Sequence, residues 1–205
     1  MTPTLFPTAP TPLRLELPDA DVTLWPAAWA PDDASDLFAA LRAKVGWQQE
    51  EILIFGERRP VPRLVAWHGD PGAAYADSGT PHEPVPWLPE LLEVRARVER
   101  LTGRRYNSVL LNLYRDGSDG MGWHADDEPE LGREPAIASV SLGAVRRFKL
   151  RHRTRREAAT TLELPHGSLL LMAGATQHHY VHAVAKTARP AGERINLTFR
   201  LVSAG

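Results

Sequence analysis

Two stretches of the chain carry apolar residues at the spacing of an amphipathic helix. In 31–45, apolar residues recur along one helical face, and acidic residues occupy the first turn. The stretch 87–103 repeats this periodicity and ends at Gly103, a residue type that commonly terminates helices. We therefore predict two helices, each packing its apolar face against a core.

After residue 106 the apolar residues recur at every second position, which is the period of β-strands. Short segments rich in β-branched residues are separated there by Gly and Pro. These segments are 107–114, 136–143, 146–152, 160–172 and 194–202. The row predicts a sandwich or barrel closed late in the chain. We expect a mainly β protein with flanking helices (α+β).

Length and composition fit one globular domain. The chain has 205 residues, of which 43% are hydrophobic, so it can bury a sizeable core. Residues 1–12 are rich in Pro and Thr, and we expect a flexible tail there, followed by a single domain over 13–205. They do not resemble a signal peptide, and no apolar run approaches the roughly 18–20 residues of a membrane span. The absence of cysteine excludes disulfides and thiolate sites, and it fits a cytoplasmic location.

Charge is distributed unevenly along a chain whose net charge is only −1. The segment 146–156 holds seven Arg and Lys together with His152. Such a local basic stripe on a near-neutral protein indicates a docking edge for phosphate, and we expect it to contact nucleic acid. A merely solvated, charged loop is the alternative.

The last predicted strand alternates polar and apolar side chains. Its polar file is Arg194, Asn196, Thr198 and Arg200. An ordinary amphipathic strand would turn this file to bulk water. If the file instead points into the mouth of a barrel, its two guanidinium groups could hold a small dicarboxylate.

Candidate metal ligands begin with His124 and Asp126, two positions apart in a glycine-flanked stretch. On a strand both would project from one face, roughly 6–7 Å apart. Two His and one carboxylate suit Fe(II) and leave positions open for reactants. The third ligand would be His178, His179 or His182, among which spacing does not choose. Two solvated polar residues on an exposed strand are the alternative.

The strand before this pair carries Asn112 and Tyr114 at alternate positions. Both side chains could donate hydrogen bonds to a bound acid from the floor of a barrel. Alternatively, the tyrosine is a core residue whose hydroxyl is satisfied locally.

These motifs together resemble the AlkB family of Fe(II)- and 2-oxoglutarate-dependent dioxygenases. The matching stretches are NLYRDGSDGMGWHADDE, PAIASVSLG, LPHGSLLLM, HHYVHAV and RINLTFR. They cover about 106–202, with weaker similarity back to about residue 50, and the closing R-x-N-x-T-x-R is more specific than H-x-D. The resemblance implies a double-stranded β-helix (jelly roll) core over about 106–205. It also implies an N-terminal helix and hairpin extension, about 13–105, that recognises substrate.

The resemblance also implies roles for individual residues. His124, Asp126 and His182 would hold Fe(II). The residues implied to bind the co-substrate 2-oxoglutarate are Asn112, Tyr114, Arg194 and Arg200. With O2, such a site would oxidatively demethylate alkylated nucleobases in DNA, of the N1-methyladenine and N3-methylcytosine type, while 2-oxoglutarate is decarboxylated.

Substrate contacts are implied in the N-terminal half and next to the metal. The stretch 51–70 resembles the hairpin of the duplex-acting branch, where Phe55 would fill the place of a flipped base. An apolar residue packed within the hairpin is the alternative. Tyr75 matches a pocket tyrosine, and Asp127 matches an acid near the base.

One position departs from the family pattern. Asp77 stands where relatives show an aromatic residue that stacks on the flipped base. Either another ring, such as Trp123 or Trp67, compensates, or the substrate differs.

We expect a monomer that binds alkylated DNA, with RNA as a second option, and no membrane. An alternative is a 2-oxoglutarate oxygenase acting on RNA, protein or a small molecule. A non-catalytic jelly-roll module would have no reason to hold a dicarboxylate beside H-x-D. A zinc hydrolase would favour a tetrahedral site and would not need the arginines.

Overall fold

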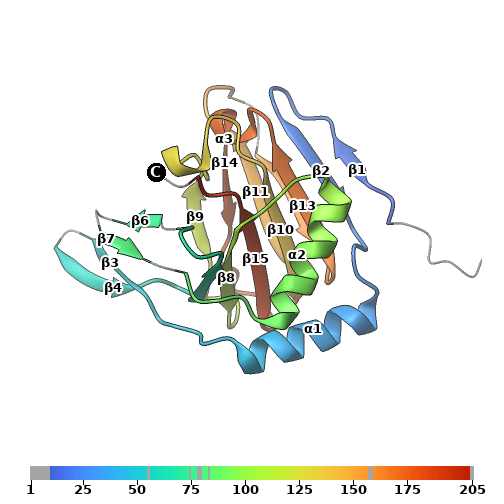
Figure 1. The fold of residues 1–205 in the computed structure, drawn as a ribbon. Helices are drawn as coiled ribbons and strands as arrows, with labels where there is room; N and C mark the ends of the chain where they lie inside the picture. The colour runs from blue at the N-terminus through green and yellow to red at the C-terminus, as the bar shows by residue number, and fades with distance from the viewer. Residues whose placement is uncertain are drawn as a thin grey trace, which may run out of the picture.

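The computed structural model describes residues 10–54, 56–73, 75–77, 80–82, 84–156 and 159–203, with the backbone alone for 54, 75–77 and 80–82. Two antiparallel sheets face each other, and two long helices cover the outer face of the larger sheet (Figure 1). Among the described residues, no helix combines the length and the hydropathy that crossing a membrane would need.

The larger sheet has seven strands and the smaller one has four. In spatial order the larger sheet holds β1 (Leu13–Leu15), β2 (Asp21–Trp25), β13 (Ser168–Ala173), β10 (Ile137–Gly143), β15 (Arg194–Arg200), β8 (Ser108–Tyr114) and β5 (Leu64–Gly69). The smaller sheet holds β12 (Thr160–Leu164), β11 (Arg146–His152), β14 (Tyr180–Val184) and β9 (Met121–His124). From β8 to β15 the chain passes repeatedly between the two sheets, which is the connectivity of a jelly roll. The predicted fold class is confirmed.

Both predicted helices are present, as α1 (Pro31–Lys44) and α2 (Pro89–Thr102). Each begins with a proline, whose missing N–H costs nothing in the first turn. Gly103 ends α2 in the left-handed conformation, with a φ of 66°, and its N–H bonds to Glu99 O. The other elements are the hairpins β3 (Glu51–Ile54) with β4 (Glu57–Pro60) and β6 (Tyr75–Asp77) with β7 (Thr80–His82), the 3-10 turn η1 (Pro129–Leu131) and the short α3 (Thr176–His179).

The alternation along β15 divides its side chains between two cores. Ile195, Leu197 and Phe199 pack with the helices, and all are fully buried. The intervening polar residues face the space between the sheets, where they are also largely buried. The polar file of the last strand therefore points inward and not to bulk water.

Two local expectations need correction. The segment 160–172 forms two strands in different sheets, because Pro165 and Gly167 turn the chain between them. Strand β9 ends at His124, so Asp126 lies in the following loop and not on the same strand. In addition to these corrections, the N-terminal β2 pairs with β13 inside the larger sheet, whose edge is β1. Local periodicity did not reveal this pairing, because its partner is far away in the sequence.

Candidate active site

Three potential metal ligands converge between the sheets. One ligand atom each from His124, Asp126 and His182 lies within 4.8 Å of the others. His124 and His182 are cross-strand neighbours of β9 and β14, with ring centres 4.2 Å apart. Nε2 of His182 is 3.5 Å from Oδ2 of Asp126. His178 and His179 point elsewhere: the first contacts the backbone oxygen of Arg133 and the second stacks on His152.

The protonation of this cluster fits a divalent cation. Nδ1 of His124 lies 2.9 Å from Gly122 O, so it donates there and leaves Nε2 as a ligand. Burial lowers the pKa of His182 to about 4, which keeps the ring neutral. Burial alone would raise the pKa of Asp126, but Arg200 and the two histidines outweigh it and hold the pKa below its ordinary value. Two imidazoles and a carboxylate are a donor set that suits Fe(II).

Asp126 is held in place by two neighbours. Its backbone N–H donates to Oε1 of Gln177 at 3.0 Å, and Arg200 donates to its carboxylate. Gln177 is 1% exposed and lies on α3, immediately before the strand that carries His182. Sequence reasoning missed Gln177, because a single glutamine beside three histidines gives no sign of its burial.

A second polar group lies at the opposite end of β15. Arg194 is 1% exposed, and its Nη2 donates to Oγ of Ser141 at 2.8 Å. Its Nε and Nη1 are buried and find no hydrogen-bond partner among the described residues. The guanidinium lies 5.3 Å from the centre of the Tyr114 ring. Since arginine stays protonated even when burial lowers its pKa, the surroundings of Arg194 fit a carboxylate.

The two arginines of the last strand therefore do different things. They stand six residues apart, or roughly 20 Å along the backbone. Arg200 donates to the candidate metal ligand Asp126, whereas Arg194 lies beside Tyr114. Between them a cavity is lined by polar and apolar side chains, among them Asn112, Tyr114, His124, His182, Asn196 and Thr198.

Asn112 has a partner that sequence reasoning missed. Its Oδ1 accepts a hydrogen bond from Nε of Arg63 at 2.7 Å. Arg63 lies just before β5, 49 residues from Asn112, so only the pairing of β5 with β8 brings the two side chains together.

Residues 21–200 match the model of the 2OG-Fe(II) oxygenase superfamily. The chain belongs to this superfamily. The predicted AlkB-like resemblance is confirmed, and the cofactors that membership implies are Fe(II), 2-oxoglutarate and O2.

Curated relatives of this oxygenase include DNA oxidative demethylase ALKBH2 of Homo sapiens, 39% identical over 180 residues, which are 83% of this chain and 69% of the relative. ALKBH2 of Bos taurus is 40% identical over 83% of this chain and 65% of the relative. Alpha-ketoglutarate-dependent dioxygenase alkB homolog 3 of Rattus norvegicus is 40% identical over 88% and 64%. The chain thus spans about two thirds of the length of these relatives. The solved structure of OsALKBH1 covers 87% of this chain and 97% of its own, with a TM-score of 0.62 and 18% identity, and it supports the fold alone.

The cations of the basic segment 146–156 do not all lie on the surface, as its sequence suggested they would. Arg146 is buried, and it donates to the backbone oxygens of Asp116, Asp119 and Ala185. It therefore fastens the turn that leads into β9 to the end of β14, the two strands that carry the candidate histidine ligands. As a buried anchor it does not offer its charge to a phosphate.

A second cluster of potential ligands, Asp19, His152 and His179, is better explained without a metal. Nδ1 of His152 accepts hydrogen bonds from the backbone N–H groups of Thr154 and Arg155 at 3.2 and 3.0 Å. The ring proton therefore sits on Nε2, which faces Oδ2 of Asp19 at 3.4 Å. This arrangement ties the turn before β2 to the end of β11.

The structure locates only some of the residues that were predicted to contact substrate. Phe55 lies outside the described residues, and Tyr75 begins β6 with its side chain outside them. Asp127 is exposed and accepts from Nη2 of Arg153 at 2.5 Å. Trp123 lies on the outer side of β9, 40% exposed, while Trp67 pairs with Leu110, a residue that lines the cavity. Of the two rings, Trp67 is therefore the one on the cavity side.

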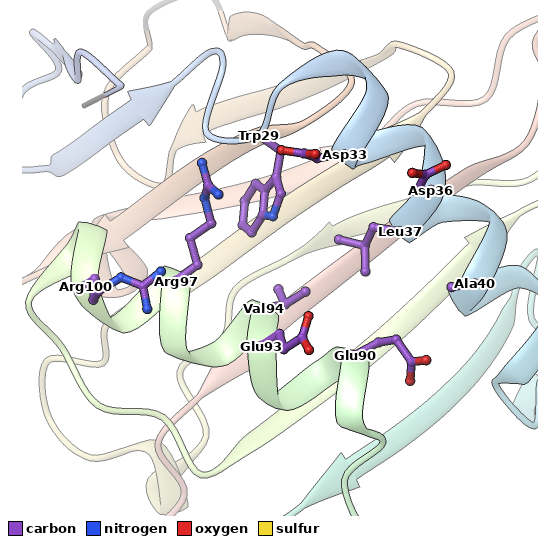
Figure 2. A pocket seen from close by; sticks show the side chains of 10 residues that line it. All are labelled: Trp29, Asp33, Asp36, Leu37, Ala40, Glu90, Glu93, Val94, Arg97 and Arg100. Atoms are coloured by element: carbon purple, nitrogen blue, oxygen red, sulfur yellow. The ribbon is translucent and has the colours of Figure 1, made fainter. Parts of the chain in front are cut away.

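Another hollow lies between α1 and α2, on the helical side of the larger sheet. Figure 2 shows carboxylates of both helices around it, with Arg97 and Arg100 at the other end. The guanidinium of Arg97 lies 5.2 Å from the centre of the Trp29 ring. Since the larger sheet separates this hollow from the candidate metal ligands, we assign it no part in the oxygenase chemistry.

Proposed function

We propose that this oxygenase demethylates alkylated nucleobases in DNA, of the N1-methyladenine and N3-methylcytosine type, with decarboxylation of 2-oxoglutarate. One observation carries the proposal: a cavity with the His124–Asp126–His182 cluster at one end and Tyr114 in its lining, beside which the buried Arg194 keeps two donors open. Such a cavity suits a metal-chelating acid whose distant carboxylate needs an anchor. Relatives at about 40% identity are named DNA oxidative demethylases, which supports the substrate.

The protein residues divide the work by position. His124, Asp126 and His182 would hold Fe(II), and the bound iron would supply oxidation by O2. Arg194, with Ser141 orienting its guanidinium, would bind the far carboxylate of 2-oxoglutarate. Asn112 would donate from its side-chain nitrogen, since Arg63 occupies its oxygen. Phe148, Met172 and Val184 line the same cavity and would limit the access of water.

The substrate base would enter beside the metal ligands. Asp127 follows Asp126 directly. Arg153 donates to one oxygen of its carboxylate, and the other oxygen would accept a hydrogen bond from the exocyclic amine of an alkylated base. Trp67 is our candidate for the ring that stacks on the base in place of the aromatic replaced by Asp77. Phe55 and Tyr75 stay predictions for the wedge and the pocket tyrosine.

A single assay tests the proposal. The protein is incubated with Fe(II), ascorbate, 2-oxoglutarate and oligonucleotides carrying N1-methyladenine or N3-methylcytosine. We expect succinate, together with a mass loss of one CH2 unit in the oligonucleotide. Succinate without the mass loss would favour RNA, a protein or a small molecule as substrate. If neither succinate nor the mass loss is observed, the protein is a non-catalytic module and the proposal is contradicted.

A pair of variants ties the activity to the cluster. Asp126→Ala should abolish turnover, because the metal would lose its carboxylate ligand, while affinity for oligonucleotide is largely kept. Asp33→Ala, an exposed aspartate of α1, is the matched control and should keep full turnover. Equal activity in both variants would remove Asp126 from the metal site.

We also propose that the protein acts as a monomer in the cytoplasm. Its lack of cysteine supports a reducing compartment. Sedimentation equilibrium at micromolar concentration tests the first point, and a concentration-dependent rise in mass would contradict it.

A further inference from the structure

The outer face of the smaller sheet gathers cations in a regular file. Along β11 the side chains alternate, with Phe148 and Leu150 buried inside. Arg147, Lys149 and Arg151 occupy the intervening positions on the outer side, where both arginines are exposed. Successive members of such a file are roughly 6.6 Å apart. The file is thus a row of positive charges along one strand.

These cations are not neutralised by carboxylates, unlike other cations of the basic segment 146–156. Arg153 pairs with Asp127 and Arg155 with Asp19. Within the described part of the chain, the three cations of the file form no salt bridge. Glu163 stands opposite Arg147 in the β11–β12 pairing and weakens the positive charge at that end. The stronger part of the file is therefore Lys149 and Arg151.

An aromatic ring completes this face. Trp123 on β9 is 40% exposed, and the guanidinium of Arg151 lies 4.3 Å from its ring centre. Because β14 separates β11 from β9, Arg151 reaches across that strand to meet the ring. A groove beside Trp123 is lined by Lys149, Lys186 and Ala183, among others. Cations thus border an exposed indole on a partly apolar floor.

We propose that this face, centred on Trp123 and Arg151, binds the single-stranded nucleotides that flank the target base. The inference rests on the proposed function. Aromatic side chains stack on bases of any sequence, and a positively charged groove follows the backbone, so the two features together match a single strand. A purely acidic protein partner would use the cations and leave the indole without a role.

The position of the face agrees with this occupant. Trp123 directly precedes His124, and the two side chains lie on opposite sides of β9, one outside and one in the cavity. Because β9 is the edge strand of the smaller sheet, a nucleic acid strand on the outer face has only this edge to pass to reach the side of the metal ligands. The target base would turn into the cavity, while the bases of the flanking nucleotides stay stacked on the Trp123 ring.

The test is equilibrium binding of fluorescent, unmodified oligothymidylate, which requires no turnover. Trp123→Ala should weaken binding about tenfold, and Trp123→Phe should restore most of the affinity, because phenylalanine keeps a stacking face. Lys149→Gln and Arg151→Gln should each lower the slope of log K against log salt by about 0.7. Arg104→Gln, an exposed arginine just after α2, is the control and should change neither quantity.

Two results would overturn the inference. One is unchanged oligothymidylate affinity and salt dependence in Trp123→Ala and Arg151→Gln, with native circular dichroism. The other is that the variants change self-association and leave DNA binding unchanged. This face would then be an interface with a second copy, whose carboxylates around the α1–α2 hollow would meet the cations (Figure 2). Because the readout is binding alone, an absence of demethylation would defeat the proposed function without affecting this result.

Discussion

The side-chain oxygen of Gln177 accepts a hydrogen bond from the backbone N–H of Asp126 at 3.0 Å, across 51 residues of sequence. This contact sets the position of the only carboxylate in the candidate metal cluster. We expect Gln177→Leu to weaken the binding of Fe(II), or of Mn(II) as its probe, by about 10- to 100-fold, because partners of metal ligands contribute on this scale. Calorimetric titration with Mn(II) measures it.

The control for this prediction is Gln48→Leu, since Gln48 is exposed and lies at the start of the β3–β4 region. Metal affinity should be unchanged in it. If Gln177→Leu binds Mn(II) as tightly as Gln48→Leu does, the loop holds Asp126 in place without Gln177.

Ser141 orients the arginine that we assign to the far carboxylate of 2-oxoglutarate. Removing its hydroxyl in Ser141→Ala deprives the buried Arg194 of a 2.8 Å hydrogen bond. We expect the KM for 2-oxoglutarate to rise about tenfold, because a hydrogen bond to a charged group contributes about 1.5–3 kcal/mol, while kcat changes little. Succinate formation at varied 2-oxoglutarate concentrations checks both constants.

Ser168 provides a matched control, because it is the cross-strand partner of Ser141 and equally buried. Its hydroxyl has no hydrogen-bond partner among the described residues. Ser168→Ala should therefore keep the KM for 2-oxoglutarate. A similar rise in both variants would indicate a general loosening of the sheet.

Arg146 should be far more important for stability than its sequence neighbours. Arg146→Met leaves three backbone oxygens of two segments without their donor, and we expect the free energy of unfolding to fall by about 3–5 kcal/mol. Urea denaturation followed by circular dichroism measures the fall. The adjacent, exposed Arg147→Met should stay within about 0.5 kcal/mol of the parent protein. Equal losses in the two variants would refute the anchoring role.

Tyr106 should make the protein sensitive to alkaline pH. Burial raises the pKa of its hydroxyl from 10.0 to about 12, and the ring packs edge-on against Phe199. In the unfolded chain the hydroxyl ionises near pH 10, so this contribution to stability is complete below pH 10. It is lost between pH 10 and 12, by about 1.4 kcal/mol per pH unit. In Tyr106→Phe the free energy of unfolding should fall less steeply over this range, and parallel curves would exclude the effect.

Residues 31–44 and 89–102 show how much of the fold local sequence predicts. Both helices follow from a 3.6-residue period, proline at the start and, for α2, glycine at the end. The strand β15 follows from strict alternation, which already separates its polar file from its apolar one. These features are local, because backbone geometry alone relates positions a few residues apart.

The side to which a strand turns its polar face, and the residues that each side chain contacts, are not local properties. The tertiary structure decided both. Alternation in β15 is equally compatible with a polar file in water or in a cavity, and packing of the second sheet put it inside. Spacing alone did not choose among three histidines; the pairing of β14 with β9 brought His182 to His124. The sequence by itself determined which residue types and periods were available, including the H-x-D pair. Only the tertiary structure decided that Gln177 supports Asp126 and that Arg146 is buried, because those contacts join residues dozens of positions apart.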